Sequence, residues 1–123
     1  MGPVDAEEIL YAAAPHLAEL ATQRMYAEQP ALEAMGDRGR AHTVEDFGHH
    51  FRALASMDPE RFTDHVRYCV GLFDARSFPQ AWLTDAWRHM AAVISQEMTP
   101  EIAGPAVAVL ATGVSAGSAR PEP

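Results

Sequence analysis

Apolar residues recur along most of this chain at spacings of three and four residues, the pattern of amphipathic helices. Strand signals are nearly absent, because no run of β-branched residues alternates with polar ones. The pattern predicts helices over about residues 5–27, 44–55 and 59–75, two more that begin near residues 79 and 100, and a short turn over 30–35. Five or six helices with short connections are typical of an all-α bundle.

Capping residues and prolines set the expected helix boundaries. Asp58-Pro59 and Thr99-Pro100 each place a capping residue before a proline, which is well tolerated at the first helical position. Pro15 lies inside the first segment and is expected to kink or divide that helix. Two glycines and an aspartate within residues 36–39 predict a non-helical connection.

Size and charge narrow the class of protein. The 123 residues, 48% of them hydrophobic, support one domain with a modest core. We expect one helical domain over residues 1–114 and a disordered tail over residues 115–123, which are small, polar and rich in proline. A formal charge of -8 argues against a general affinity for nucleic acid or anionic membranes.

The cellular compartment is inferred from cysteine usage and from the lack of long apolar runs. Cys69 is the only cysteine, so an internal disulfide is excluded and the chain fits a reducing compartment. No apolar run approaches the roughly 20 residues that span a bilayer. The N-terminus lacks a basic segment followed by an apolar one. We therefore expect a cytoplasmic protein.

The stretch from Thr43 to Arg52 carries the strongest candidate chemistry, and Asp46 has two interpretations. In the first, Thr43 caps a helix and Asp46, three residues later, reaches back as in a capping box. In the second, the Asp46 carboxylate points into a pocket and accepts hydrogen bonds from the N–H groups of a ligand. The two interpretations are compatible with each other.

The histidines raise the question of a metal site. His49 and His50 are adjacent, so their side chains point about 100° apart on a helix and cannot both face one ligand. His65 and Cys69 have the four-residue spacing of a helical metal pair, but the multiple thiolates of a structural zinc site are lacking. The sequence therefore predicts no metal site. His65 remains a candidate haem ligand.

No catalytic motif is present in the sequence. It has no Ser/His/Asp or Cys/His motif, no glycine-rich phosphate loop and no evident pair of catalytic carboxylates. Cys69 lies on a predicted apolar stripe, where cysteine usually acts as a small hydrophobic residue. We therefore expect a protein that is not an enzyme.

From Thr43 to about Met98 the chain resembles phycobiliproteins, the globin-like light-harvesting proteins that hold linear tetrapyrroles. In that family a cysteine opens a conserved helix, an aspartate follows three residues later, and an arginine six residues after that. Here the order is Thr43, Asp46 and Arg52. A Pro-x-x-Trp segment follows the next helix in that family, and here it is Pro79 to Trp82.

Two further groups of proteins look similar. The helical segment that precedes the cobalamin domain in many bacterial light and cobalamin sensors resembles residues 40–93, through Glu45-Asp46, His50, Asp58-Pro59 and Phe62. Stand-alone globins associated with bilin synthesis look like a third member of this lineage and match the small size of the chain. These resemblances imply a globin-like bundle of five to six helices.

The resemblance also implies a set of ligand contacts. The family aspartate contacts pyrrole nitrogens, a role that falls to Asp46 here, and Thr43 replaces the cysteine that forms the thioether, so binding is expected to be non-covalent. Aromatic and imidazole side chains would form the pocket wall: Phe47, His50, Phe51, Tyr68, Phe73, Trp82 and Trp87. Because guanidinium groups pair with carboxylates in two-point geometry, the candidates for the propionates are Arg38, Arg40 and Arg52.

We therefore expect the chain to bind a bilin such as biliverdin or phycocyanobilin, as a carrier, a sensor or a biosynthetic accessory. Two alternatives stay open. One is a ligand-free dimerisation or regulatory module, and the other is a haem-binding or cobalamin-related sensor module. Two tryptophans in a small bundle are compatible with an exposed apolar face and hence with a homodimer.

Overall fold

The computed structural model describes residues 5–119, and within that range the chain consists of helices and short connections, with no strand. Its elements follow in the order α1 (Ala6–Glu28), the 3-10 helix η1 (Pro30–Met35), α2 (Gly36–Leu54), α3 (Pro59–Ala75), α4 (Gln80–Glu97) and α5 (Pro100–Ser118). The prediction of an all-α protein with five to six helices is confirmed. None of these helices combines the length and the apolar character needed to cross a bilayer.

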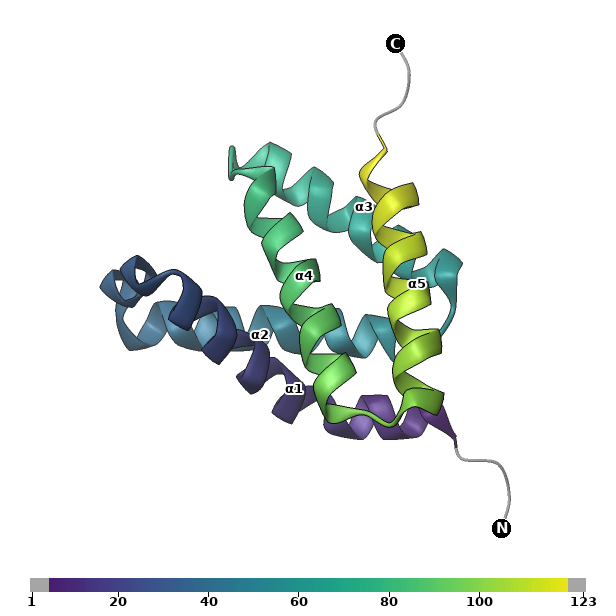
Figure 1. Ribbon diagram of the computed structural model, residues 1–123. Helices are drawn as coiled ribbons and strands as arrows, with labels where there is room; N and C mark the ends of the chain where they lie inside the picture. Colours follow the sequence, from purple (N-terminus) through teal and green to yellow (C-terminus); the bar gives the residue numbers. More distant parts are fainter. Residues whose placement is uncertain (1–4, 120–123) are drawn as a thin grey trace.

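The helices pack as two pairs joined by α4. Figure 1 shows α1 and α2 running antiparallel along the lower part of the molecule, with α5 crossing in front of α3 on the right. The most extensive contacts join α1 to α2 and α3 to α5, while α4 packs against α1 and α5. The N-terminal half of α3 is therefore held by α5, and its C-terminal half extends toward the start of α4.

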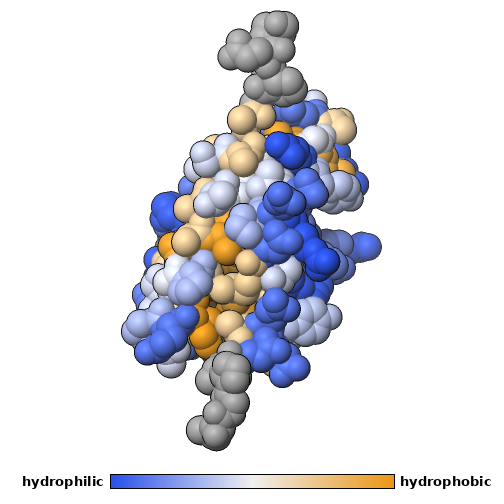
Figure 2. Space-filling view, turned by 90° about the vertical axis from the view of Figure 1, so that its right-hand side faces the viewer, coloured by the Kyte–Doolittle hydropathy of each residue, from blue (hydrophilic) through white to orange (hydrophobic). Residues whose placement is uncertain are grey.

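One hydrophobic core joins all five α-helices. Its largest fully buried apolar side chains are Leu10, Leu17, Phe47, Phe51, Leu54, Phe62, Val66, Met90, Val93 and Ile94. The exposed positions of α5, in contrast, are mostly small, and the face that carries this helix shows a band of weakly hydrophobic residues bordered by polar ones (Figure 2). The apolar stripes predicted for residues 44–55 and 59–75 supply much of this core.

The start of α2 differs from the expectation. This helix begins at Gly36 instead of near Val44, so the stretch expected to be a connection is helical. Thr43 lies inside the helix, where its hydroxyl donates to the carbonyl of Gly39 at 3.1 Å. The capping-box interpretation of Thr43 and Asp46 is therefore wrong. Gly36, with a φ of 72°, provides the turn from η1 into α2, which a glycine adopts without strain.

The start of α3 agrees with the sequence prediction, whereas the course of α1 and the end of α5 differ from it in part. Asp58 caps α3 by accepting from the amide of Glu60 at 2.9 Å, as predicted. Pro15 does not divide α1, because burial of Ala14 and Leu17 beside it offsets the lost backbone hydrogen bond. α5 continues to Ser118, so residues 115–118 are helical instead of part of a tail, and the predicted tail over 120–123 lies outside the described residues.

The crossing of α5 over α3 depends on two glycines, which gives a first prediction. A Cβ at Gly113 would lie 2.5 Å from a ring carbon of Phe62, and one at Gly117 would lie 2.8 Å from the carbonyl oxygen of Thr63. Backbone atoms cannot yield as a flexible side chain can, so Gly113→Ala and Gly117→Ala should each lower the free energy of unfolding by about 1–3 kcal/mol. Denaturant titration followed by circular dichroism measures this.

Gly104→Ala is the matched control on the same helix. No atom lies within 4 Å of a Cβ built at Gly104, and alanine is the better helix former, so this variant should be unchanged or more stable by up to about 1 kcal/mol. Equal stability of the Gly104, Gly113 and Gly117 variants would contradict the close packing of the two helices.

Candidate functional site

A cavity of about 700 Å³ lies between α2, α3 and the start of α4, and the end of α1 and η1 close its other side. The volume is within the range of about 300–1,000 Å³ that is usual for small-molecule sites. Its lining is largely apolar and aromatic: Met25, Leu32, Met35, Phe47, Tyr68, Leu72, Phe73, Phe78, Trp82, Leu83 and Ala86. The polar lining residues are Gln29, Thr43, Asp46, His49, His50, His65, Cys69, Arg76 and Asp85.

Two polar contacts hold the helix ends that frame this cavity. At the corner between α3 and α4, the Gln80 amide donates to the carbonyl of Val70 at 3.2 Å and to the Asp74 carboxylate at 2.9 Å. At the opposite end, the Gln29 amide donates to the Asp85 carboxylate at 3.2 Å, which joins the end of α1 to α4. The cavity is therefore preformed by interactions that link α4 to α3 and to the end of α1.

The structure brings together six of the eleven residues that the sequence predicts as ligand contacts. These six line the cavity and come from three helices: Asp46, Phe47 and His50 of α2, Tyr68 and Phe73 of α3, and Trp82 of α4. The remaining five do not line it: Phe51, Arg52, Trp87, Arg38 and Arg40.

Two of those five form the support behind the cavity wall. Phe51 is only 1% exposed and belongs to the core. Trp87 packs its ring against His50, with 4.7 Å between the ring centroids, and against Phe62 at 5.8 Å. It therefore holds the imidazole of His50 in place from the core side and does not contact the cavity itself.

None of the three candidate arginines lines the cavity, and two of them contact other residues. Arg52 approaches the Nδ1 atom of His49 at 3.0 Å. Arg40 pairs with Glu33 at 3.5 Å and lies over the ring of Tyr26, 4.8 Å from its centroid. Arg38 is exposed on α2.

Arg76 does line the cavity, although it is not among the arginines predicted from the sequence. It follows the last residue of α3 and continues the face of that helix that carries Cys69, Leu72 and Phe73. Extending that periodic face by three residues beyond Phe73 identifies Arg76, so the signal was present in the sequence.

Aromatic side chains line the rim of the cavity and remain open to solvent. The Phe78 ring lies 5.5 Å from that of Phe73 and 5.6 Å from that of Trp82, so the three rings form a continuous row. Tyr68 and Trp82 are 66% and 50% exposed. Exposed aromatic rings beside a preformed cavity are typical of a surface that a ligand covers.

Asp46 lies among polar residues of the cavity lining. Its side chain is open to solvent, yet nearby protein atoms displace part of its hydration, and this loss raises the pKa of the carboxyl above its ordinary value. Glu45 raises the pKa further, whereas His49, His42 and Arg76 oppose the shift. Within residues 5–119 no side chain donates a hydrogen bond to this carboxylate, so its acceptor capacity is free for a ligand.

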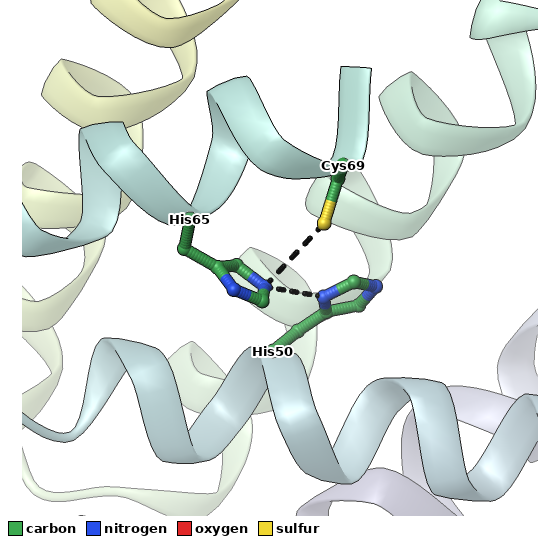
Figure 3. Close-up of side chains that lie close together, drawn as sticks. All are labelled: His50, His65 and Cys69. Carbon is green, nitrogen blue, oxygen red and sulfur yellow. Dashed lines mark hydrogen bonds between the residues drawn. The ribbon is translucent and has the colours of Figure 1, made fainter. Parts of the chain in front are cut away.

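Three residues form a polar cluster in the cavity wall (Figure 3). The Nδ1 atom of His50 and the Nε2 atom of His65 are 2.8 Å apart, so the two rings share a hydrogen bond whose donor depends on the tautomers. The sulfur of Cys69 lies 3.6 Å from the same Nε2 atom. His50 comes from α2, and His65 and Cys69 lie one turn apart on α3.

Burial keeps all three members of this cluster uncharged at neutral pH. Loss of hydration, followed by the proximity of His65 and His49, lowers the pKa of His50 to about 3. Burial also lowers the pKa of His65, with a smaller contribution from His49. Burial and the nearby Asp46 carboxylate raise the pKa of the Cys69 thiol to about 11. Cys69 is therefore a weak nucleophile in this environment.

Comparisons with protein-family models, with curated proteins and with solved structures find no match to this chain.

The buried His50 makes stability depend on pH, which is the second prediction. Its folded-state pKa lies below the ordinary value of 6.5, so its contribution to stability is present above pH 6.5 and is lost as the pH falls toward 3. The free energy of unfolding should fall by up to about 1.4 kcal/mol for each pH unit below 6.5. Denaturant titrations at a series of pH values between 7 and 4 measure the slope.

A His50→Gln variant should show a shallower slope, because glutamine does not titrate. His16→Gln serves as the control, since His16 is an exposed side chain far from the cavity lining. If the His50→Gln protein kept the full wild-type slope, protonation of His50 would not be the cause.

Proposed function

We propose that this chain binds a linear tetrapyrrole non-covalently in the cavity between α2, α3 and α4, as a carrier, a sensor or a biosynthetic accessory. One observation carries the proposal: six residues that the sequence singles out for this ligand, on three separate helices, line one cavity of about 700 Å³. The arrangement of the helices around it is proposed to be globin-like, as in the proteins that the sequence resembles.

The lining matches the chemistry of a bilin. The conjugated rings of a bilin are flat and apolar, and the rings of Tyr68, Phe73 and Trp82 offer surfaces against which they can stack. A bilin also carries pyrrole N–H groups, which need acceptors once water is excluded. The Asp46 carboxylate supplies that acceptor, and part of its hydration is already displaced by nearby protein atoms.

The propionates of a bilin require a cation at the edge of the cavity. Arg76 meets this requirement because it lines the cavity, whereas Arg52 approaches His49 and Arg40 pairs with Glu33. A guanidinium can bind a propionate through two parallel hydrogen bonds. We therefore assign a propionate to Arg76 in preference to Arg38, Arg40 and Arg52.

Non-covalent binding follows from the nucleophiles available in the cavity. Thr43 lines the cavity, but its hydroxyl donates to the Gly39 carbonyl and is a poor nucleophile toward a vinyl group. The raised pKa of the Cys69 thiol leaves almost no thiolate at neutral pH. Neither residue favours a thioether or an ether bond to the ligand.

Haem is a second candidate ligand, favoured by one specific observation. His50 and His65 both line the cavity and stay neutral at neutral pH, which is the form of imidazole that binds iron. Haemin should therefore be titrated alongside the bilins. A Soret band that is lost when His50 or His65 is replaced, in a chain that binds no bilin, would favour this alternative.

The role of Asp46 gives the third prediction. Biliverdin or phycocyanobilin added to the purified chain, in the presence of a chelator, should give a saturable, sharpened and red-shifted band at one ligand per chain. Loss of a charge-assisted hydrogen bond costs about 1.5–3 kcal/mol, so Asp46→Asn should weaken binding by about 10- to 100-fold.

Asp64→Asn is the matched control, because Asp64 is an exposed carboxylate on α3 outside the cavity. It should leave both the affinity and the spectrum unchanged. The proposal would be wrong if neither bilin changed its spectrum on mixing with the wild-type chain, and the role of Asp46 would be wrong if both variants behaved alike.

The propionate contact gives the fourth prediction. The wild-type chain should bind biliverdin more tightly than its dimethyl ester, because the ester cannot form the ion pair with Arg76. Arg76→Gln should remove most of this preference and leave affinity for the ester nearly unchanged. Arg61→Gln, at an exposed position of α3 outside the cavity, is the control. An unchanged preference in the Arg76 variant would exclude this contact.

A further inference from the structure

The cluster of His50, His65 and Cys69 has a second capability that the tetrapyrrole proposal does not use. One ligand atom from each of the three side chains lies within 4.8 Å of the other two. Figure 3 shows the two rings and the thiol converging from α2 and α3 on one point. Three converging nitrogen and sulfur donors are the ligand types that zinc and related transition metals prefer.

We propose that His50, His65 and Cys69 bind one divalent transition-metal ion of the zinc type, with a fourth coordination position open toward the cavity. The third ligand, His50, comes from a different helix and is brought to His65 by the contact between α2 and α3. The sequence alone placed only His65 and Cys69 at the spacing of metal ligands, and it predicted no metal site. Three protein ligands and one open position are the arrangement of zinc sites that bind an exchangeable ligand.

Two of the three donor–donor distances are close to those of a tetrahedral site, and the third, between His50 and Cys69, is at most 4.8 Å. With bonds of about 2.0–2.1 Å to nitrogen and about 2.3 Å to sulfur, tetrahedral geometry places two nitrogens about 3.3 Å apart and a nitrogen and a sulfur about 3.6 Å apart. The His65–Cys69 pair is already 3.6 Å apart. The two ring nitrogens at 2.8 Å need to separate by about half an ångström, which a small rotation of the rings provides.

The surroundings select the type of ion. Trp87, Phe47 and Phe62 pack around the two imidazoles, with ring centroids 4.7–6.4 Å away, so the donors lie against an apolar wall. Mg²⁺ and Ca²⁺ prefer several oxygen ligands and would find too few here. A zinc-type ion accepts two imidazoles and one thiolate.

Charge and protons balance in the binding step. Two neutral imidazoles bind through Nδ1 of His50 and Nε2 of His65, and the hydrogen bond between these atoms is replaced by two bonds to the ion. The ring that donated this hydrogen bond stays neutral, because its proton moves through solvent to its other ring nitrogen. The Cys69 thiol loses its proton to solvent and binds as the thiolate, so binding one M²⁺ releases one proton and leaves the site with a net charge of about +1. A water molecule, or a donor atom of a ligand in the cavity, completes the coordination.

This site is independent of the proposed function in its residues, although the two share a cavity. The assigned tetrapyrrole contacts Asp46 and Arg76 are not metal ligands. A chain that binds the metal but no bilin, and a chain that binds bilin in the presence of a chelator but no metal, are therefore separate and distinguishable outcomes.

The fifth prediction concerns Co²⁺, which reports its ligands by absorbance. Titration of the metal-free full chain, kept reduced with a phosphine, should give one Co²⁺ per chain, the intense visible bands of a tetrahedral site and a near-ultraviolet thiolate-to-cobalt band. Cys69→Ser should abolish the thiolate band, and His65→Gln should weaken the visible bands. Removing a residue that only hydrogen-bonds to a metal ligand lowers metal affinity by about 10- to 100-fold. Removing a ligand itself should therefore lower the Co²⁺ affinity of each variant by at least that factor.

His16→Gln is the matched control, because His16 is an exposed histidine outside the cavity. It should bind Co²⁺ as the wild-type chain does. The helical circular dichroism of each metal-free variant checks that the chain still folds. The proposal is excluded if the wild-type spectrum lacks the thiolate band, or if Cys69→Ser binds Co²⁺ with unchanged affinity and spectrum.

A second measurement needs no variant. Zn²⁺ should slow the alkylation of Cys69 by iodoacetamide at least tenfold, since a metal-bound sulfur inside a cavity is withdrawn from reaction, whereas Mg²⁺ at the same concentration should leave the rate unchanged. Equal rates with and without Zn²⁺ would overturn the proposal even if other histidines bound the ion at the surface.

Discussion

The close approach of α5 to α3 is the contact on which the cavity depends. Gly113 and Gly117 bring the backbone of α5 against Phe62, Thr63 and Val66, so α3 is held in one rotation about its own axis. That rotation places His65, Cys69 and Phe73 in the lining of the cavity. The cavity therefore depends on a helix crossing in which none of its own lining residues takes part.

The polar groups inside this apolar wall are arranged so that their burial is tolerated. A buried neutral imidazole needs a hydrogen-bond partner, and His50 and His65 supply that partner to each other across the gap between α2 and α3. Trp87 fixes the ring of His50 from behind, while Phe62 packs beside His65. The cluster is consequently held in place before any ligand arrives, which lowers the entropy that binding must overcome. The open end of the cavity has a different character, with Asp46 and exposed aromatic rings available to a ligand.

How much could be predicted from the sequence depended on whether a feature is local. The Asp58-Pro59 helix start depends on backbone groups within one turn, and it was predicted correctly. The start of α2 was missed because glycines and an aspartate also occur in connections, and this stretch continues a helix that packs extensively against α1. Tyr68 and Trp82 were found because aromatic residues on a helix face are visible in the sequence. The contact of His50 with His65 requires the relative rotation and distance of two helices, which no spacing within one helix determines.

Asp46 and the cluster of His50, His65 and Cys69 are coupled through charge. The Asp46 carboxylate raises the pKa of the Cys69 thiol, so the two groups already interact. A divalent ion bound to His50, His65 and Cys69 would leave a net charge of about +1 where the cluster is now neutral. That charge favours the ionised form of Asp46 and therefore strengthens the acceptor that the proposed tetrapyrrole requires. Because coupling between two binding equilibria is reciprocal, a ligand that holds Asp46 in its ionised form must equally favour the metal. The electrostatics of the cavity thus favour joint occupancy, provided that the tetrapyrrole leaves space for the fourth coordination position or fills it with one of its own nitrogens.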